Sequence, residues 1–239
     1  KPMVVRTLDL GSDKMLTEKS PEEERNPCLG LRSIRLSLRQ LPMFRTQLRA
    51  ILRASVHGDV RVMFPLVSTI LELRQARLVL SDVMEDLAEH DIDFNPKLKI
   101  GIMVETPRAA LRADDIALNS AFLSFGTNDL TQMTYGLSRD DAGRFMSDYV
   151  QQGVFPEDPF HTLDIDGVGE LLKMGVSRAR GVKNDIVLSI CGEHGGSPES
   201  IDFCRQIGMD YVSCSPFRVP VAKLAAAQLA IKDRIDPSR

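Results

Sequence analysis

The sequence lacks the features that mark several classes of protein. No stretch of about eighteen apolar residues is present, and no basic segment followed by an apolar one opens the chain, so neither a membrane span nor a signal peptide is indicated. A net charge of −3 gives no basic excess for a nucleic-acid surface. With 43% hydrophobic residues over 239 positions, the composition predicts a soluble, globular, cytoplasmic protein with a sizeable core.

Cysteine is scarce and has none of the spacings typical of metal sites. The four cysteines are Cys28, Cys191, Cys204 and Cys214. In a chain of this length and composition we expect free thiols rather than a disulfide framework. A Gly-x-Gly-x-x-Gly motif is also missing after every apolar run, which makes an open-sheet dinucleotide enzyme a weak alternative.

What the sequence does contain is a regular alternation of short apolar runs and helical patterns. The predicted strands cover residues 2–10, 60–67, 99–105, 121–126, 186–191 and 211–214. The predicted helices cover residues 33–55 (interrupted near Pro42), 70–89, 108–118, 167–180, 198–207 and 219–231, while residues 15–30 and 133–159 read as irregular. Such an alternation predicts an α/β fold with a parallel sheet and helices outside it.

The number of predicted strands leaves two architectures open. A closed (β/α)₈ TIM barrel needs eight strands, whereas the alternation supplies six, so the sheet is either an open doubly wound one or a barrel that lacks two βα units. Because the first strand begins within two residues of the N-terminus, we favour a barrel truncated at that end. The whole chain, residues 1–239, is then expected to form a single domain.

Polar residues follow two of the apolar runs at the point where each strand should end. Glu105 closes one run, and Gly126, Thr127, Asn128 and Asp129 follow the other. Carboxyl ends of parallel strands share one sheet edge, so the two acids should lie close together as ligands for Mg²⁺. Gly126 allows a ligand close to the backbone, and its two successors offer hydrogen bonds to anionic oxygens. Taken singly, each acid could equally cap a helix.

Three arginines lie at predicted strand ends or in loops. They are Arg6, Arg32 and Arg139. The planar guanidinium suits phosphate and carboxylate, so with Mg²⁺ these residues would bind a small, multiply anionic ligand. For any one of the thirty basic residues, a solvated surface position is the alternative.

Several motifs resemble the phosphoenolpyruvate-utilising enzymes. Residues 124–143 (beginning Ser-Phe-Gly-Thr-Asn-Asp-Leu-Thr-Gln), 190–196 (Ile-Cys-Gly-Glu-His-Gly-Gly) and 210–220 look like the phosphoenolpyruvate-binding barrel of pyruvate, phosphate dikinase. Residues 5–14 and 47–55 look more like phosphoenolpyruvate-protein phosphotransferase, Enzyme I of the sugar phosphotransferase system. The chain therefore reads as a mosaic of two related patterns, the second over about the first hundred residues.

The resemblance implies a (β/α)₈ barrel that binds phosphoenolpyruvate or pyruvate with Mg²⁺. By matching positions, Glu105 and Asp129 are the Mg²⁺ ligands, while Arg6, Asn128 and Arg139 contact the phosphate. Gly126 and Thr127 belong to the same binding loop, Arg32 is a further candidate contact, and Cys191 is the acid/base at the methylene carbon of the substrate. No role falls to His194, and the other three cysteines are expected to be structural.

The implied reaction exchanges a phosphoryl group with a histidine on a separate domain, and a homodimer is expected. Both families carry an arginine-containing segment one strand earlier, so the chain alone is expected not to complete either reaction. A dikinase-type enzyme ranks first because its motifs cover most of the site. Enzyme I and a non-catalytic binding or dimerisation module are the alternatives.

Overall fold

The computed structural model describes residues 1–11 and 24–235. The chain divides into two compact units. The first comprises Lys1–Met103 and Asp115–Phe122, and the second comprises Val104–Asp114 and the chain from Leu123 onward. The strands are hydrogen-bonded in chain order, β1-β2-β3-β4-β5-β6.

Parallel strands form the base of the first unit. These are β1 (Met3–Arg6), β2 (Val60–Phe64) and β3 (Lys99–Val104). Val62 in β2 pairs with Val5 on one side and with Ile100 on the other. Alternate residues of β2 are buried, because successive side chains of a strand point to opposite faces.

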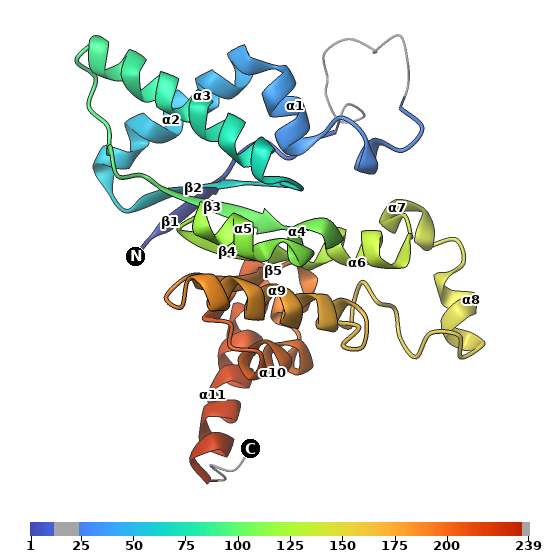
Figure 1. The fold of residues 1–239 in the computed structure, drawn as a ribbon. Coiled ribbons are helices and arrows are strands. Elements are labelled where there is room, and N and C mark those ends of the chain that lie inside the picture. Colours follow the sequence, from blue (N-terminus) through green and yellow to red (C-terminus); the bar gives the residue numbers. More distant parts are fainter. Residues whose placement is uncertain (12–23, 236–239) are drawn as a thin grey trace. The chain divides into compact units, whose positions relative to one another are not determined.

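Helices of the first unit pack against each other as well as on the sheet. In Figure 1, α3 (Ile70–Glu89) runs beside α1 (Ser33–Arg39) and α2 (Leu41–Ala54). The expected break near Pro42 is confirmed: α1 ends before Gln40, and the proline lies in the first turn of α2, where its missing N–H costs little. An ion pair of 2.5 Å between Arg45 and Asp82 joins α2 to α3.

Helix α3 starts with a complete capping box. The Glu72 backbone N–H donates to Thr69 Oγ1 at 3.2 Å, and the Thr69 N–H donates to Glu72 Oε2 at 2.9 Å. Two backbone donors that the helix itself cannot pair are thereby satisfied. This explains why the helix begins where the sequence predicted it.

Buried strands and small-residue contacts dominate the second unit. Its further elements are α4 (Pro107–Leu111), α5 (Ala113–Leu118), β4 (Phe122–Gly126), α9 (Val168–Val182), β5 (Val187–Cys191), α10 (Pro198–Gln206), β6 (Tyr211–Val212) and α11 (Val219–Ile235). Part of α5 and the first residue of β4 belong to the first unit. Every residue of β4 is buried. A Cβ atom on Gly175 of α9 would lie 2.7 Å from the Phe125 ring, so the glycine lets this helix approach the strand closely.

The expectation that residues 133–159 are irregular is wrong in part. Three short helices occupy much of this stretch: α6 (Thr127–Tyr135), α7 (Arg139–Ala142) and α8 (Met146–Gln151). Ser138 caps α7 by accepting from the Asp141 N–H at 3.3 Å. Edge-to-face contacts of 5.1–5.4 Å between ring centroids then link Tyr135, Phe155, Tyr149 and Phe145. The sequence analysis did not anticipate these contacts between aromatic residues.

The strand order decides between the two architectures left open by the sequence. A doubly wound sheet reverses its strand order at a switch point, whereas these six strands follow one another without reversal. The predicted α/β class is confirmed, and the order is that of successive units in a barrel. The lack of two βα units stays a prediction, as does the single domain.

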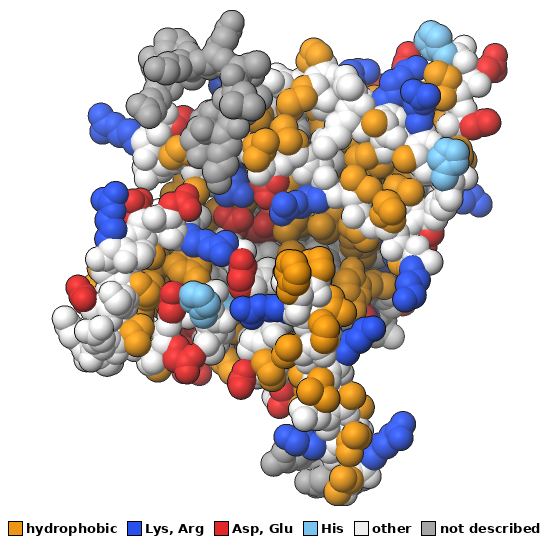
Figure 2. Space-filling view, turned by 180° about the vertical axis from the view of Figure 1, so that it is seen from behind, with side chains coloured by type: hydrophobic (Ala, Val, Ile, Leu, Met, Phe, Trp, Pro, Cys, Tyr) orange, Lys and Arg blue, Asp and Glu red, His pale blue; other side chains and the backbone are white. Residues whose placement is uncertain are grey.

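Helix α11 packs through small residues and leaves larger apolar ones exposed. Ala222 and Ala225 pack with Ile201 of α10. Hydrophobic side chains run along the segment at the bottom of Figure 2, where the exposed ones are Val219, Val221, Leu224, Ile231 and Ile235. Among the described residues, no helix is long and apolar enough to cross a membrane.

We expect Thr69→Ala to lower the free energy of unfolding by about 1 kcal/mol, because it removes the side-chain acceptor at the start of α3. Urea unfolding measures the change. Ser81→Ala, at an exposed position of the same helix, is the matched control and should change stability by less than about 0.5 kcal/mol. Equal effects of the two substitutions would contradict the capping role.

Candidate active site

The carboxylate of Glu105 lies against the bare backbone of Gly126. Glu105 directly follows β3 and is only 2% exposed, whereas Gly126 is the last residue of β4. A Cβ atom at position 126 would be 2.5 Å from Glu105 Oε2. A larger residue at position 126 would have to displace the Glu105 carboxylate, so the glycine lets the ends of the two strands bring this acid and the backbone together.

A buried hydrogen-bond chain connects the start of α6 to the segment after β5. Thr127 Oγ1 lies 2.8 Å from His194 Nδ1 and 3.2 Å from the carbonyl oxygen of Cys191. The other ring nitrogen, His194 Nε2, is 3.0 Å from the carbonyl oxygen of Pro159. A carbonyl can only accept, so Nε2 carries a proton and donates to it.

The protonation state of His194 follows from its surroundings. The imidazole is completely buried, and this burial lowers its pKa below the ordinary histidine value. In the neutral ring Nδ1 is an acceptor, so the single proton of the Thr127 hydroxyl is shared between Nδ1 at 2.8 Å and the Cys191 carbonyl oxygen at 3.2 Å. His194 ties together three segments that the sequence separates by more than thirty residues.

Cys191 ends β5 and faces the end of β4. Its thiol donates to the carbonyl oxygen of Phe125 at 3.6 Å. Gly192 follows with a φ of +113°, and a Cβ atom there would lie 2.9 Å from Thr127 Oγ1. Only glycine readily adopts this positive φ and leaves room for the Thr127 hydroxyl. Gly192 therefore allows the chain to turn sharply just after the thiol. All four cysteines are free thiols, as expected.

Glu193 contacts two of the predicted phosphate-binding residues. Its Oε1 accepts from Arg139 Nη2 at 3.0 Å. Burial would raise the pKa of Glu193, but the adjacent Asn128 amide and the hydrogen bond and charge of Arg139 together lower it. The side chain is therefore a carboxylate at neutral pH.

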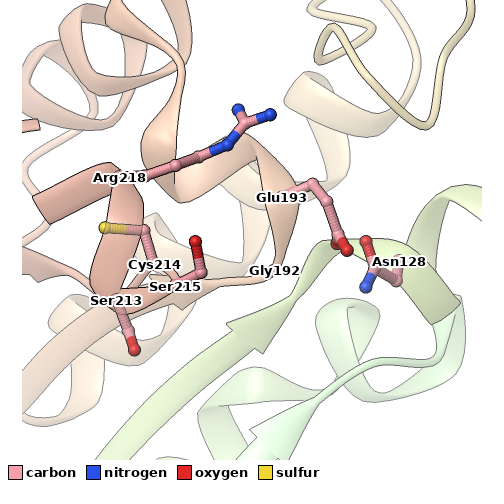
Figure 3. Close-up of a pocket in the computed structure, with 7 residues that line it drawn as sticks. All are labelled: Asn128, Gly192, Glu193, Ser213, Cys214, Ser215 and Arg218. Atoms are coloured by element: carbon pink, nitrogen blue, oxygen red, sulfur yellow. The ribbon is translucent and has the colours of Figure 1, made fainter. Parts of the chain in front are cut away.

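Asn128, Gly192 and Glu193 border an open pocket of about 480 Å³. Figure 3 shows the Asn128 amide and the Glu193 carboxylate facing each other, with the Arg218 side chain extended on the Glu193 side. The pocket is lined by Asn128, Gly192, Glu193, Ser213, Cys214, Ser215 and Arg218. Such a lining is polar and offers hydrogen-bond donors, which suits a small anionic ligand.

Within the first unit, Asp9 holds both of the predicted arginines. Arg32 Nη2 lies 2.9 Å from Asp9 Oδ1, and Arg6 Nη1 lies 3.1 Å from Asp9 Oδ2. The Ser33 hydroxyl also donates to Asp9, from a residue whose φ of +53° is in the left-handed region. Burial would raise the pKa of Asp9, but these hydrogen bonds and the two guanidinium charges lower it.

The structure thus groups the predicted residues in two sets. The set in the second unit lies on the ends of β3, β4 and β5 and on α6 and α7: Glu105, Gly126, Thr127, Asn128, Asp129, Arg139 and Cys191. The set in the first unit is Arg6 and Arg32, which share Asp9.

Sequence reasoning missed three residues that hold these sets in place. They are Asp9, Glu193 and His194. Asp9 follows Arg6 by three positions, and the other two stand directly after Cys191-Gly192, so proximity to predicted site residues was the available signal. Their partners are far away in the sequence and could not be read from it.

Comparison with known proteins identifies the family. Residues 1–231 match the model of the PEP-utilising enzyme family, PEP-binding domain. The chain belongs to this family. It is 45% identical in sequence to a pyruvate, phosphate dikinase of Rhizobium meliloti. The alignment covers 97% of this chain and 26% of the dikinase. It is 44% identical to the enzyme of Clostridium symbiosum over 88% of this chain and 25% of the relative.

The chain spans about a quarter of the length of the curated relatives it matches. Because the likeness to the Rhizobium dikinase covers nearly the whole chain, it includes the first hundred residues, whose motifs resemble Enzyme I. A citrate lyase from Burkholderia xenovorans LB400 shares the fold with a TM-score of 0.51 at 15% identity, over 80% of this chain and 59% of the lyase. This likeness concerns the fold alone.

We expect acidification to destabilise the protein through His194. Because burial lowers the pKa of His194 in the folded protein, the unfolded chain binds the proton more readily. The contribution of neutral His194 to the free energy of unfolding is therefore complete above about pH 6.5, the ordinary histidine pKa, and declines as the pH falls below that value. Urea unfolding at pH 7.5 and 5.5 should show a smaller loss for His194→Gln than for the wild type. The exposed His57→Gln control should behave as the wild type; identical losses in all three proteins would exclude this role for His194.

Proposed function

We propose that this chain binds phosphoenolpyruvate and pyruvate together with Mg²⁺, as the phosphoenolpyruvate-binding part of a dikinase-type phosphotransferase. In the full reaction the phosphoryl group would pass between phosphoenolpyruvate and a histidine on a separate domain. The observation that carries the proposal is the convergence of Glu105, the junction of β4 with α6 and Cys191 at neighbouring strand ends of the second unit.

The residues present fit Mg²⁺. Glu105 and Asp129 supply hard carboxylate oxygens, and the Glu105 carboxylate occupies the space beside the Gly126 backbone that a larger residue would fill. Within residues 1–11 and 24–235, no group of three or more His, Cys, Asp and Glu side chains is placed to hold a metal ion. The two carboxylates would therefore share the ion with substrate oxygens and water, and the bound ion would neutralise charge on the phosphoryl group and the enolate.

Asn128 and Arg139 are the proposed contacts to the phosphoryl group in the second unit. Phosphoryl transfer needs positioned charge more than covalent help from the protein, and an amide donor beside a guanidinium supplies it. Glu193 accepts a hydrogen bond from Arg139 and lies beside the Asn128 amide, so it links the two side chains. Arg6 and Arg32 of the first unit are proposed as further phosphate contacts, with Asp9 fixing their orientation.

Cys191 is the proposed acid at the methylene carbon. When the phosphoryl group leaves phosphoenolpyruvate, the enolate of pyruvate remains. The Cys191 S–H bond then breaks as a C–H bond forms at the methylene carbon, which yields pyruvate and a thiolate. Cys204 does not suit this role, since burial raises its pKa to about 12 and its side chain is only 2% exposed.

Enzyme I chemistry is the second candidate, because residues 5–14 and 47–55 carry its motifs. Both candidates use the same ligand and the same site residues, and they differ in the final phosphate acceptor. A non-catalytic binding or dimerisation module would not need a thiol at position 191. A homodimer is proposed for either enzyme.

Isothermal titration of phosphoenolpyruvate into the purified chain, with and without Mg²⁺, tests the site. We expect Mg²⁺-dependent binding that Asp129→Asn and Glu105→Gln each weaken by at least about tenfold, because each removes a charged ligand. Asp148→Asn, on an exposed position of α8, is the control and should bind as the wild type. If both site variants bind with wild-type affinity, the metal pair is wrong.

The role of Cys191 predicts loss of enolisation in Cys191→Ala. Reversal of the protonation step removes a methyl proton from pyruvate, so methyl protons should exchange with D₂O in the presence of Mg²⁺. Proton NMR follows the decay of the methyl signal, which should stop in Cys191→Ala and persist in the Cys204→Ala control. Exchange that continues unchanged in Cys191→Ala would assign the proton transfer to another group.

A further inference from the structure

Glu193 stands at a junction between the two residues proposed to contact phosphate. It begins the short 3-10 helix Glu193–Gly196, directly after the turn at Gly192. From there its carboxylate reaches Arg139 at the start of α7 and the Asn128 amide in the first turn of α6. The sequence separates Glu193 from these partners by more than fifty residues.

The amide of Asn128 has a chemically preferred orientation here. Two buried acceptor atoms of the pocket, Asn128 Oδ1 and Glu193 Oε2, have no hydrogen-bond partner among the described residues. Figure 3 shows these two groups facing each other. Turning the amide by half a revolution exchanges its oxygen and nitrogen, so that Nδ2 donates to Oε2. Glu193 then accepts from Arg139 with one oxygen and from Asn128 with the other.

We infer that Glu193 is a positioning residue that holds Arg139 and Asn128 ready for the phosphoryl group and thereby makes the site select phosphorylated over unphosphorylated ligands. This inference rests on the proposed function. Arginine has five N–H donors, and the contact with Glu193 Oε1 uses a single nitrogen, so the guanidinium can bind an anion at the same time. The Arg139 side chain is 44% exposed, and without an anchor it would lose its fixed orientation.

The charge of Glu193 does not make this side of the pocket anionic. Arg139 neutralises it, and Arg218, which lines the same pocket, adds a further positive charge. Ordering a long side chain costs up to about 2 kcal/mol of conformational entropy, and a carboxylate that orders it in advance removes that cost from binding.

The test compares two ligands in the presence of Mg²⁺ by isothermal titration into the purified chain. Phosphoenolpyruvate carries the phosphoryl group, whereas oxalate resembles the pyruvate enolate without it. We expect Glu193→Gln, which keeps the size and loses the charge, to weaken phosphoenolpyruvate binding about tenfold and oxalate binding less than about twofold. Glu170→Gln removes the partner of an exposed ion pair on α9 and serves as the control, with both affinities unchanged.

A double-mutant comparison shows whether Glu193 acts through Arg139. In an Arg139→Ala background, Glu193→Gln should weaken phosphoenolpyruvate binding by a smaller factor than in the wild type, because one of its two targets is gone. An equal factor in both backgrounds overturns this route. An equal loss of phosphoenolpyruvate and oxalate affinity in Glu193→Gln would show a general structural role and contradict the inference. Unchanged affinities for both ligands would show that Glu193 has no positioning role. If the wild-type chain binds neither ligand, the proposed function fails, and this inference fails with it.

Discussion

The hydrogen-bond chain from Thr127 through His194 to Pro159 is the interaction on which the second unit's site depends. It joins the start of α6, the segment after β5 and the stretch before α9 in a fully buried position. A buried polar group left without a partner costs about 1–3 kcal/mol, so none of the three segments can move without loss. The site residues are direct neighbours of these hydrogen-bonded residues in the sequence. Asn128 follows Thr127, Glu193 precedes His194, and Cys191 precedes the turn at Gly192.

Each predicted anion-binding arginine forms an ion pair with a carboxylate of the protein. Asp9 holds Arg6 and Arg32 in the first unit, and Glu193 holds Arg139 in the second. A cation fixed in this way keeps its charge and gives up orientational freedom before any ligand arrives. The two units therefore use the same device at separate places, each built within its own fold.

Glycine has a spatial function at the two strand ends that matter most. Gly126 makes room for the Glu105 carboxylate, and Gly192 makes room for the Thr127 hydroxyl while turning the chain after Cys191. Sequence analysis assigned Gly126 to close approach of a ligand, and the structure shows close approach of a protein carboxylate. This contact between residues 21 positions apart is one that only folding reveals.

The sequence by itself determined the α/β class, the six strands and the placement of acids and thiol at strand ends, because hydrophobic periodicity and helix-capping signals act over a few neighbouring residues. It misread residues 133–159, where aromatic contacts between separate short helices outweigh a polar composition. Only the tertiary structure decided the partners of Asp9, Glu193 and His194. Hydrogen bonds and ion pairs between residues tens of positions apart depend on how strands are ordered in the sheet, which local pattern does not encode.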